Sequence, residues 1–137
     1  MHEPQPRQPR RILVIDDEPQ VRGFLEKVLM RAGYEVSTAK NGAEGLYIFE
    51  IEPFDLILTD IFMPDQDGLE VLRDLTHKAP DIPVIVTSGG SPDMPQDFLK
   101  FAKALGADVT LPKPFDQAQL LDAIERLLAD EAETSSR

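Results

Sequence analysis

The 137-residue sequence contains no cysteine and no tryptophan, and it has only two histidines, His2 and His77. The absence of cysteine excludes disulfide bonds and thiolate metal sites, and the shortage of histidine argues against a histidine-rich zinc site. Basic residues are also scarce, since 14 lysines and arginines stand against 25 aspartates and glutamates, for a formal net charge of −11. Nucleic acids and anionic membranes are themselves negatively charged, so we expect neither to be a direct partner.

No uninterrupted apolar run is long enough to cross a bilayer. The first ten residues are rich in proline and glutamine and lack the apolar core of a signal peptide, which makes the cytoplasm the expected location. The length suits one domain, and a content of 42% hydrophobic and 28% charged residues is ordinary for a protein that buries a core. We expect a disordered arm over residues 1–9, one folded domain over 10–129 and a polar tail over 130–137.

Five short apolar segments alternate with five segments of helical periodicity. The strands are predicted at residues 12–15, 34–38, 55–60, 84–87 and 108–111. The helices are predicted to begin near Pro19, Asn41, Gly68, Phe98 and Asp116. The first of them carries a helical stripe made of Val21, Phe24, Leu25, Val28 and Leu29. An alternating βα pattern with right-handed crossovers predicts a parallel sheet covered by helices on both faces, for which the flavodoxin-like order 2-1-3-4-5 is one common solution.

Polar residues recur where the predicted strands end. Asp16 and Asp17 follow the first strand, Asp60 ends the third, Thr87 ends the fourth and Lys113 follows the fifth. Taken singly, each has an ordinary explanation, such as a helix cap for either of the first two aspartates or a solvated loop lysine. Together they meet at one edge of a parallel sheet, where three carboxylates would repel one another and favour a bound cation.

The oxygen-only character of this set suits Mg²⁺, or Mn²⁺ as a substitute. A metal, a lysine and a hydroxyl around one carboxylate are what phosphoryl transfer to that carboxylate requires, because the chemistry consists mostly of positioning and charge neutralisation. The sequence therefore predicts a phosphoryl-accepting site centred on Asp60.

Four segments carry a resemblance to a known family. They are residues 12–18 (ILVIDDE), 60–68 (DIFMPDQDG), 86–88 (VTS) and 113–115 (KPF). In this order and spacing they resemble the CheY-like receiver domain of bacterial two-component response regulators, over about residues 10–128. The resemblance implies an α/β, doubly wound, five-stranded parallel sheet in the order 2-1-3-4-5.

The resemblance also implies roles for single residues. Asp60 matches the phosphoacceptor, Thr87 matches the hydroxyl that bonds a phosphoryl oxygen, and Lys113 matches the lysine that pairs with the phosphoryl group. The bond between Lys113 and Pro114 matches a cis peptide of the family. Receivers often carry tyrosine or phenylalanine three residues before the lysine, and the sequence departs from that pattern with Thr110.

For the metal, the resemblance implies Mg²⁺ as the cofactor. Asp17 matches the main acidic ligand, and Asp16 acts beside it either directly or through water. Asp60 and the backbone carbonyl of Phe62 match the remaining protein ligands.

The expected function is that of a single-domain receiver, which takes a phosphoryl group from a sensor histidine kinase or a histidine phosphotransfer protein in a Mg²⁺-dependent reaction. It would not be an enzyme in the ordinary sense, although it would catalyse its own phosphorylation and dephosphorylation. Output is expected through contact with a downstream protein, on the face formed by the fourth helix, fifth strand and fifth helix.

Three alternatives remain at this point. One is a degenerate receiver that binds proteins without being phosphorylated, and a second is a metal-dependent aspartyl phosphatase. Phosphatases of the haloacid-dehalogenase type need a second acid two residues after the nucleophile, where this chain has Phe62. The third is a flavodoxin-type binding module, which would need a Ser/Thr/Gly phosphate loop at residues 16–18, where this chain has three acids.

Overall fold

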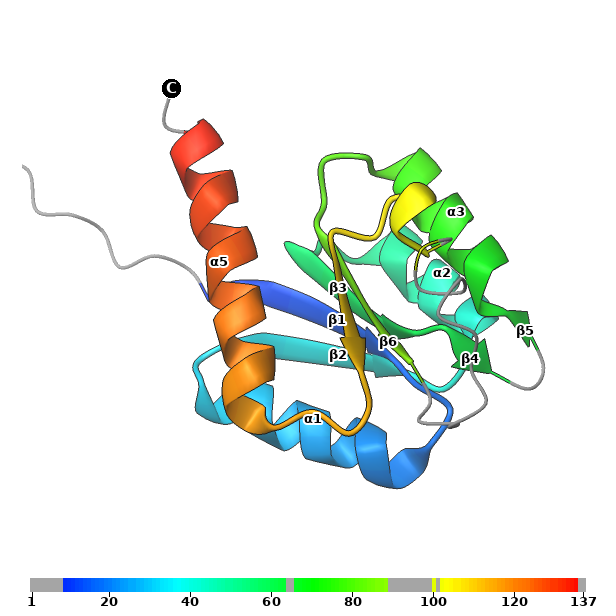
Figure 1. The fold of residues 1–137 in the computed structure, drawn as a ribbon, viewed down its shortest axis with the longest axis horizontal. Coiled ribbons are helices and arrows are strands. Elements are labelled where there is room, and N and C mark those ends of the chain that lie inside the picture. Colours follow the sequence, from blue (N-terminus) through cyan, green and yellow to red (C-terminus); the bar gives the residue numbers. More distant parts are fainter. Residues whose placement is uncertain (1–8, 64–65, 89–99, 101, 136–137) are drawn as a thin grey trace, which may run out of the picture.

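A five-stranded parallel sheet forms the centre of the molecule (Figure 1). The computed structural model describes residues 9–63, 66–88, 100 and 102–135. The strand order is β2-β1-β3-β6-β7, which confirms the predicted order 2-1-3-4-5. The strands are β1 (Arg11–Ile15), β2 (Glu35–Ala39), β3 (Leu56–Asp60), β6 (Val84–Ser88) and β7 (Val109–Pro112). Each lies within about one residue of its predicted bounds.

Helices connect the strands. They are α1 (Pro19–Arg31), α2 (Gly42–Ile51), α3 (Gly68–Lys78) and α5 (Gln117–Ser135). The predicted start of the fourth helix lies outside the described residues, and residues 102–104 are helical before Gly106. Helix α5 continues through the acidic residues that the sequence assigned to a polar tail. None of the helices in the described part of the chain is both long enough and apolar enough to cross a membrane.

Two two-residue strands were not predicted. β4 (Phe62–Met63) pairs antiparallel with β5 (Gln66–Asp67) directly after the main strand β3. This small pairing links the end of β3 to the start of α3.

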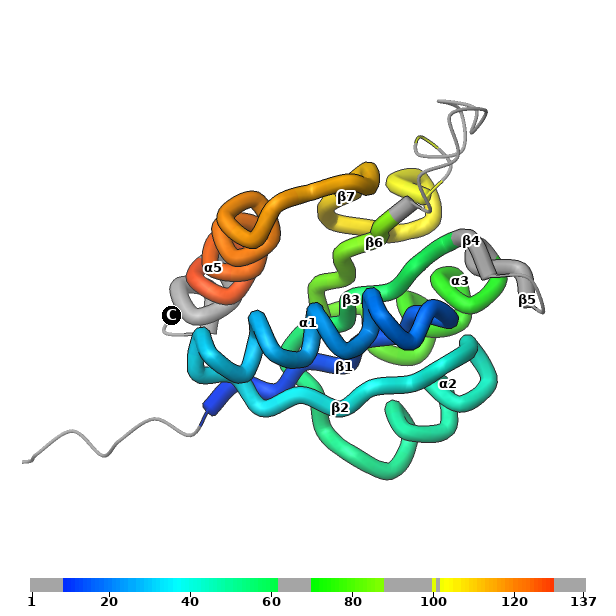
Figure 2. Tube along the Cα trace, turned by 90° about the horizontal axis from the view of Figure 1, so that it is seen from below, coloured from blue at the N-terminus to red at the C-terminus, as the bar shows by residue number. Residues whose placement is uncertain are grey.

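The sheet separates two apolar cores, because successive residues of a strand point to opposite faces. In β1, Ile12 and Val14 join the core under α1 and α5, whereas Leu13 and Ile15 join the core under α2 and α3. Figures 1 and 2 show α1 and α5 on one side of the sheet and α2 and α3 on the other. Burial on both faces explains why the strands read as continuous apolar runs rather than alternating ones.

Local signals fix the helix ends as the sequence predicts. Asn41 accepts a hydrogen bond from the backbone N–H of Glu44 at 2.8 Å and so caps α2. Asp116 and Gln119 exchange side-chain to backbone hydrogen bonds at the start of α5, which is a capping box. After α1, Gly33 has a φ of +98°, a left-handed conformation that closes the helix at little cost only for glycine.

Gly45 marks the closest approach of α2 to the sheet. A Cβ atom placed there would overlap Cδ1 and Cγ1 of Ile15, so the helix sits directly on β1. Gly23, in α1, is the opposite case, since a Cβ there would meet nothing within 4 Å.

We expect Gly45→Ala to lower the free energy of unfolding by about 1–3 kcal/mol, because the added methyl group overpacks the contact with Ile15. Gly23→Ala makes the same chemical change in an exposed helical position and should instead raise stability by about 0.4–1 kcal/mol. Urea unfolding of both variants beside the wild type checks the pair. Equal effects in the two variants would contradict the close contact between α2 and β1.

Candidate functional site

The carboxyl ends of four neighbouring strands bring the predicted polar residues to one edge of the sheet. Asp60 is the last residue of β3, and its Cα pairs across to Thr87 in β6. Asp16 and Asp17 follow β1, and Lys113 follows β7. Residues far apart in the chain thus meet, as the alternation of strands and helices predicted.

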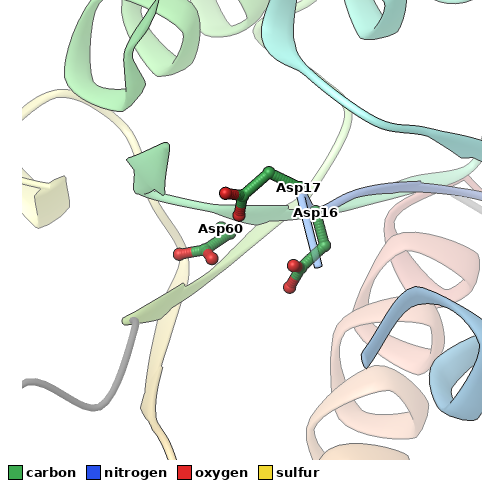
Figure 3. A group of neighbouring side chains, drawn as sticks. All are labelled: Asp16, Asp17 and Asp60. Atoms are coloured by element: carbon green, nitrogen blue, oxygen red, sulfur yellow. The ribbon is translucent and has the colours of Figure 1, made fainter. Parts of the chain in front are cut away.

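Three carboxylates form the centre of this edge (Figure 3). One carboxylate oxygen from each of Asp16, Asp17 and Asp60 lies within 4.8 Å of the others. Asp16 and Asp60 are only 1% and 2% exposed, while Asp17 is half-buried. Like charges held this close and this deep in the protein favour a compensating cation, since water cannot screen them fully.

The backbone around Asp16 is tightly held. Its N–H donates to the carbonyl of Ala39 at 3.1 Å, and its Oδ1 accepts from the N–H of Glu18 at 2.9 Å. Its carbonyl accepts from Nη1 of Arg22 at 2.7 Å. The N-cap residue of α1 is Glu18, which makes no side-chain cap hydrogen bond. The two aspartates therefore do not serve as the cap of that helix, which was their ordinary explanation.

Lys113 is the cation of the site. Its Nζ lies 3.0 Å from Oδ2 of Asp16 and 3.3 Å from Oδ2 of Asp60. Burial alone would lower the pKa of Lys113, but the negative charges of Asp60 and Asp16 and their hydrogen bonds outweigh it and raise the pKa above its usual value. Lys113 therefore stays protonated, and its positive charge is paired with two of the three carboxylates.

Thr87 supplies a hydroxyl that is nearly inaccessible to solvent. The residue is 1% exposed, and within the described part of the chain its Oγ1 has no hydrogen-bond partner. An unpaired buried hydroxyl costs about 1–3 kcal/mol, so such groups are usually partnered. Thr87 pairs with Asp60 across the sheet. Its hydroxyl is therefore suited to donate a hydrogen bond to an oxygen of a group attached to the Asp60 carboxylate.

The donor set fits a hard divalent cation. Only oxygen ligands are offered, two carboxylates come from consecutive residues, and the third lies on the neighbouring strand. This composition suits Mg²⁺ or Mn²⁺ rather than zinc. Phe62, whose carbonyl was predicted as a further ligand, lies two residues beyond Asp60 in β4, and the role of that carbonyl stays a prediction.

Two other sequence predictions fall on described residues. The peptide bond between Lys113 and Pro114 is cis, as the resemblance implied. Thr110 lies in β7 opposite Val86, and its half-buried position carries no aromatic ring. The loop after Ser88, at residues 89–99, lies outside the described residues.

An apolar groove with a volume of about 340 Å³ opens next to the site. It is lined by Gln20, Val21, Phe24, Leu25, Lys113, Pro114 and Phe115. The groove runs between α1 and the segment that joins β7 to α5. Phe24, a member of the predicted helical stripe of α1, is 50% exposed and lies on this groove.

Sequence reasoning missed three residues near the site. Arg22 gave no signal, because an arginine on the polar face of a helix is ordinary. Phe24 and Phe115 lie on different elements, and only the folded structure brings them to one surface.

Comparison with known proteins agrees with this geometry. The family described as response regulator receiver domain matches residues 12–125. Among curated proteins, the chain is 37% identical to the response regulator receiver protein CpdR of Brucella abortus, over 87% of this chain and 97% of CpdR. It is 36% identical to the DNA-binding transcriptional regulator NtrC of Escherichia coli, but it spans only 24% of that protein and 86% of its own length. Matching receivers thus occur both as nearly whole proteins and as parts of larger regulators.

Solved structures point the same way. A CheY-like receiver domain protein from Methanospirillum hungatei superposes with a TM-score of 0.87 at 31% identity, covering 93% of this chain and 99% of the other. The response regulator TrrA of Thermotoga maritima, solved in complex with Mg²⁺-BeF, gives a TM-score of 0.75 at 36% identity. The match covers 86% of this chain and 98% of TrrA. The strand order, the acidic edge and these matches together assign the chain to the receiver domain family of two-component response regulators.

Proposed function

We propose that the chain accepts a phosphoryl group on Asp60 in a Mg²⁺-dependent reaction. The observation that carries this proposal is the setting of one buried carboxylate. Asp60 lies close to the ammonium group of Lys113, to two further carboxylates and to Thr87, whose hydroxyl is unpaired among the described residues. A nucleophile, a cation and a hydrogen-bond donor are then in place around the position that a phosphoryl group would occupy.

The donor in this proposal is a phosphohistidine of a sensor kinase or of a histidine phosphotransfer protein. An oxygen of Asp60 attacks the phosphorus, the new O–P bond forms as the N–P bond breaks, and the electron pair of that bond returns to the imidazole nitrogen. The product is an acyl phosphate on Asp60. Lys113 is close enough to neutralise charge on the transferred oxygens, and Thr87 can donate a hydrogen bond from its hydroxyl to one of them.

Asp16, Asp17, Asp60 and the carbonyl of Phe62 would hold the metal ion. Bound there, Mg²⁺ supplies positive charge to the phosphoryl oxygens and relieves the repulsion between the carboxylates. The Mg²⁺-BeF complex of TrrA supports this assignment by likeness only.

The apolar groove is the surface that suits the donor. A histidine can reach Asp60 only if its protein packs beside the site, and the groove begins at Lys113. Phe24 and Phe115 offer apolar area on the two walls, while the site itself is charged. We propose that the donor protein packs in this groove.

Output would follow through protein contact in the cytoplasm, and the chain would act as a single-domain receiver rather than as an enzyme on other substrates. Coverage of nearly the whole of CpdR supports the single-domain assignment. The face formed by the fourth helix, β7 and α5 remains the proposed contact for a downstream protein. Of this face, the structure describes β7, α5 and residues 100 and 102–104.

A degenerate receiver that only binds proteins is the second candidate, and one observation favours it. Thr110 replaces the aromatic residue that receivers often use to couple phosphorylation to their surface. The intact acidic set and the placement of Lys113 favour phosphorylation instead.

The first test is intact mass after incubation with Mg²⁺ and acetyl phosphate. We expect one added phosphoryl group on the wild type, and none on Asp60→Asn or in the presence of EDTA. Asp81→Asn, an exposed aspartate away from the site, is the matched control and should be labelled like the wild type. Labelling of Asp60→Asn would contradict the assignment of the acceptor, and no labelling of any form would favour the binding-only receiver.

Metal binding should appear as added stability, because a ligand that binds only the folded state stabilises it. At a Mg²⁺ concentration one hundred times the dissociation constant, the free energy of unfolding should rise by about 2.7 kcal/mol. Asp17→Asn should lose most of this gain, and Asp81→Asn should keep it. Urea unfolding with and without Mg²⁺ measures the difference, and an equal gain in all three proteins would rule out Asp17 as a ligand.

The groove predicts a difference between protein and small-molecule donors. Phe24→Ala should reduce kcat/KM about tenfold with a purified phosphohistidine donor domain, since a few large anchors such as an aromatic ring carry most of the binding energy of an interface and each costs more than about 1 kcal/mol when truncated. Labelling by acetyl phosphate should not change, because so small a donor needs no groove. Met30→Ala is the control, since Met30 is 59% exposed on the same helix and lies outside the groove. Equal losses in both variants would argue against docking in the groove.

A further inference from the structure

Arg22 is tied to the loop that carries two of the three carboxylates. Its side chain donates from Nη1 to the backbone carbonyl of Asp16 at 2.7 Å. Its backbone N–H donates to the carbonyl of Glu18 at 2.9 Å. The second of these is the ordinary i to i−4 bond of the first helical turn, so it is the side-chain contact that ties Arg22 to the turn between β1 and α1.

The carbonyl of Asp16 belongs to the peptide unit that leads into Asp17. A peptide bond is planar. Fixing the direction of this carbonyl therefore also fixes the direction of the Asp17 N–H and the position of the Asp17 Cα atom. Arg22 thus acts on the backbone between the two acidic residues.

The two carboxylates depend on this backbone to different degrees. The side chain of Asp16 is held by Lys113 on one oxygen and by the N–H of Glu18 on the other. No hydrogen bond or ion pair joins the side chain of Asp17 to another described residue, so its direction depends on its own rotamer and on the backbone that carries it. Loss of the contact from Arg22 should therefore be felt mainly at Asp17.

We propose that Arg22 is a positioning residue of the metal site, which sets the direction of the Asp17 carboxylate by holding the peptide between Asp16 and Asp17. The inference rests on the proposed Mg²⁺-dependent function and adds a residue that touches neither metal nor phosphoryl group. Outer contacts that orient ligands commonly change metal affinity by about 10- to 100-fold.

A role of Arg22 through its charge and a role through positioning predict opposite changes in the affinity for Mg²⁺, which makes the proposal testable. If Arg22 were only a nearby positive charge, its removal would strengthen the binding of a cation to the acidic site. If it positions Asp17, its removal should weaken that binding, although the site becomes more negative.

The experiment compares Mg²⁺ affinity by calorimetry in the wild type, Arg22→Gln, Arg22→Lys and Arg31→Gln. Arg31 is the matched control, because it is an exposed arginine at the other end of α1 and its replacement removes the same charge. We expect the dissociation constant to rise about tenfold in Arg22→Gln, to rise less in Arg22→Lys and to change less than twofold in Arg31→Gln. In the metal-free protein, amide exchange at Asp17 and Glu18 should accelerate in Arg22→Gln alone.

An unchanged or tighter dissociation constant in Arg22→Gln would overturn the proposal, as would a tenfold loss in Arg31→Gln. Thermal unfolding without metal separates position from stability, because a merely structural role would lower the melting temperature and leave the affinity of the folded protein intact. If Arg22→Gln does not fold, Arg22→Lys decides, and wild-type affinity together with wild-type exchange in that variant would overturn the proposal. Failure of the proposed function looks different, since the wild type itself would then bind no Mg²⁺.

Discussion

Repulsion between three carboxylates is the constraint on which the rest of this structure depends. Asp16, Asp17 and Asp60 share a small space at the edge of a buried sheet, where water screens charge poorly. The fold offsets only part of this repulsion with Lys113, and the remaining negative charge is what makes the edge attractive to a cation and to chemistry that uses one. Burial and like-charge groups of this kind are features that cluster at functional sites.

The sheet can hold such an edge because its interior is rigid. Both faces of β1 and β3 are sealed by apolar cores, and Ile15 lies directly under the backbone of α2 at Gly45. Side chains packed at this density cannot shift to relieve the charges at the strand ends. The apolar runs before Asp16 and Asp60 thus form the sheet, and they also fix the positions of the two carboxylates.

Much of the fold and of the candidate site was predictable from the sequence, and the reasons are local. Strand ends, caps such as Asn41 and Asp116, and the left-handed Gly33 each follow from the conformational preferences of single residues. The acidic edge followed from topology, because parallel strands bring their carboxyl ends together. Helical periodicity correctly put Phe24 on the apolar stripe of α1, but it cannot show which members of that stripe are buried and which line an open groove. The contact of Arg22 was not predictable, since a polar helical arginine has no pattern that reveals what its flexible side chain reaches.

Lys113 joins the two surfaces on which the proposed function depends. Its ammonium group contacts Asp16 and Asp60, while its residue also lines the apolar groove beside α1. A protein seated in that groove would exclude water from Lys113 and so strengthen its attraction to nearby negative charge. A phosphohistidine donor would then meet a stronger field than a free small molecule does. Recognition of the donor and neutralisation of the transferred group would then act through one side chain, which gives a physical reason for an apolar groove immediately beside the acidic edge.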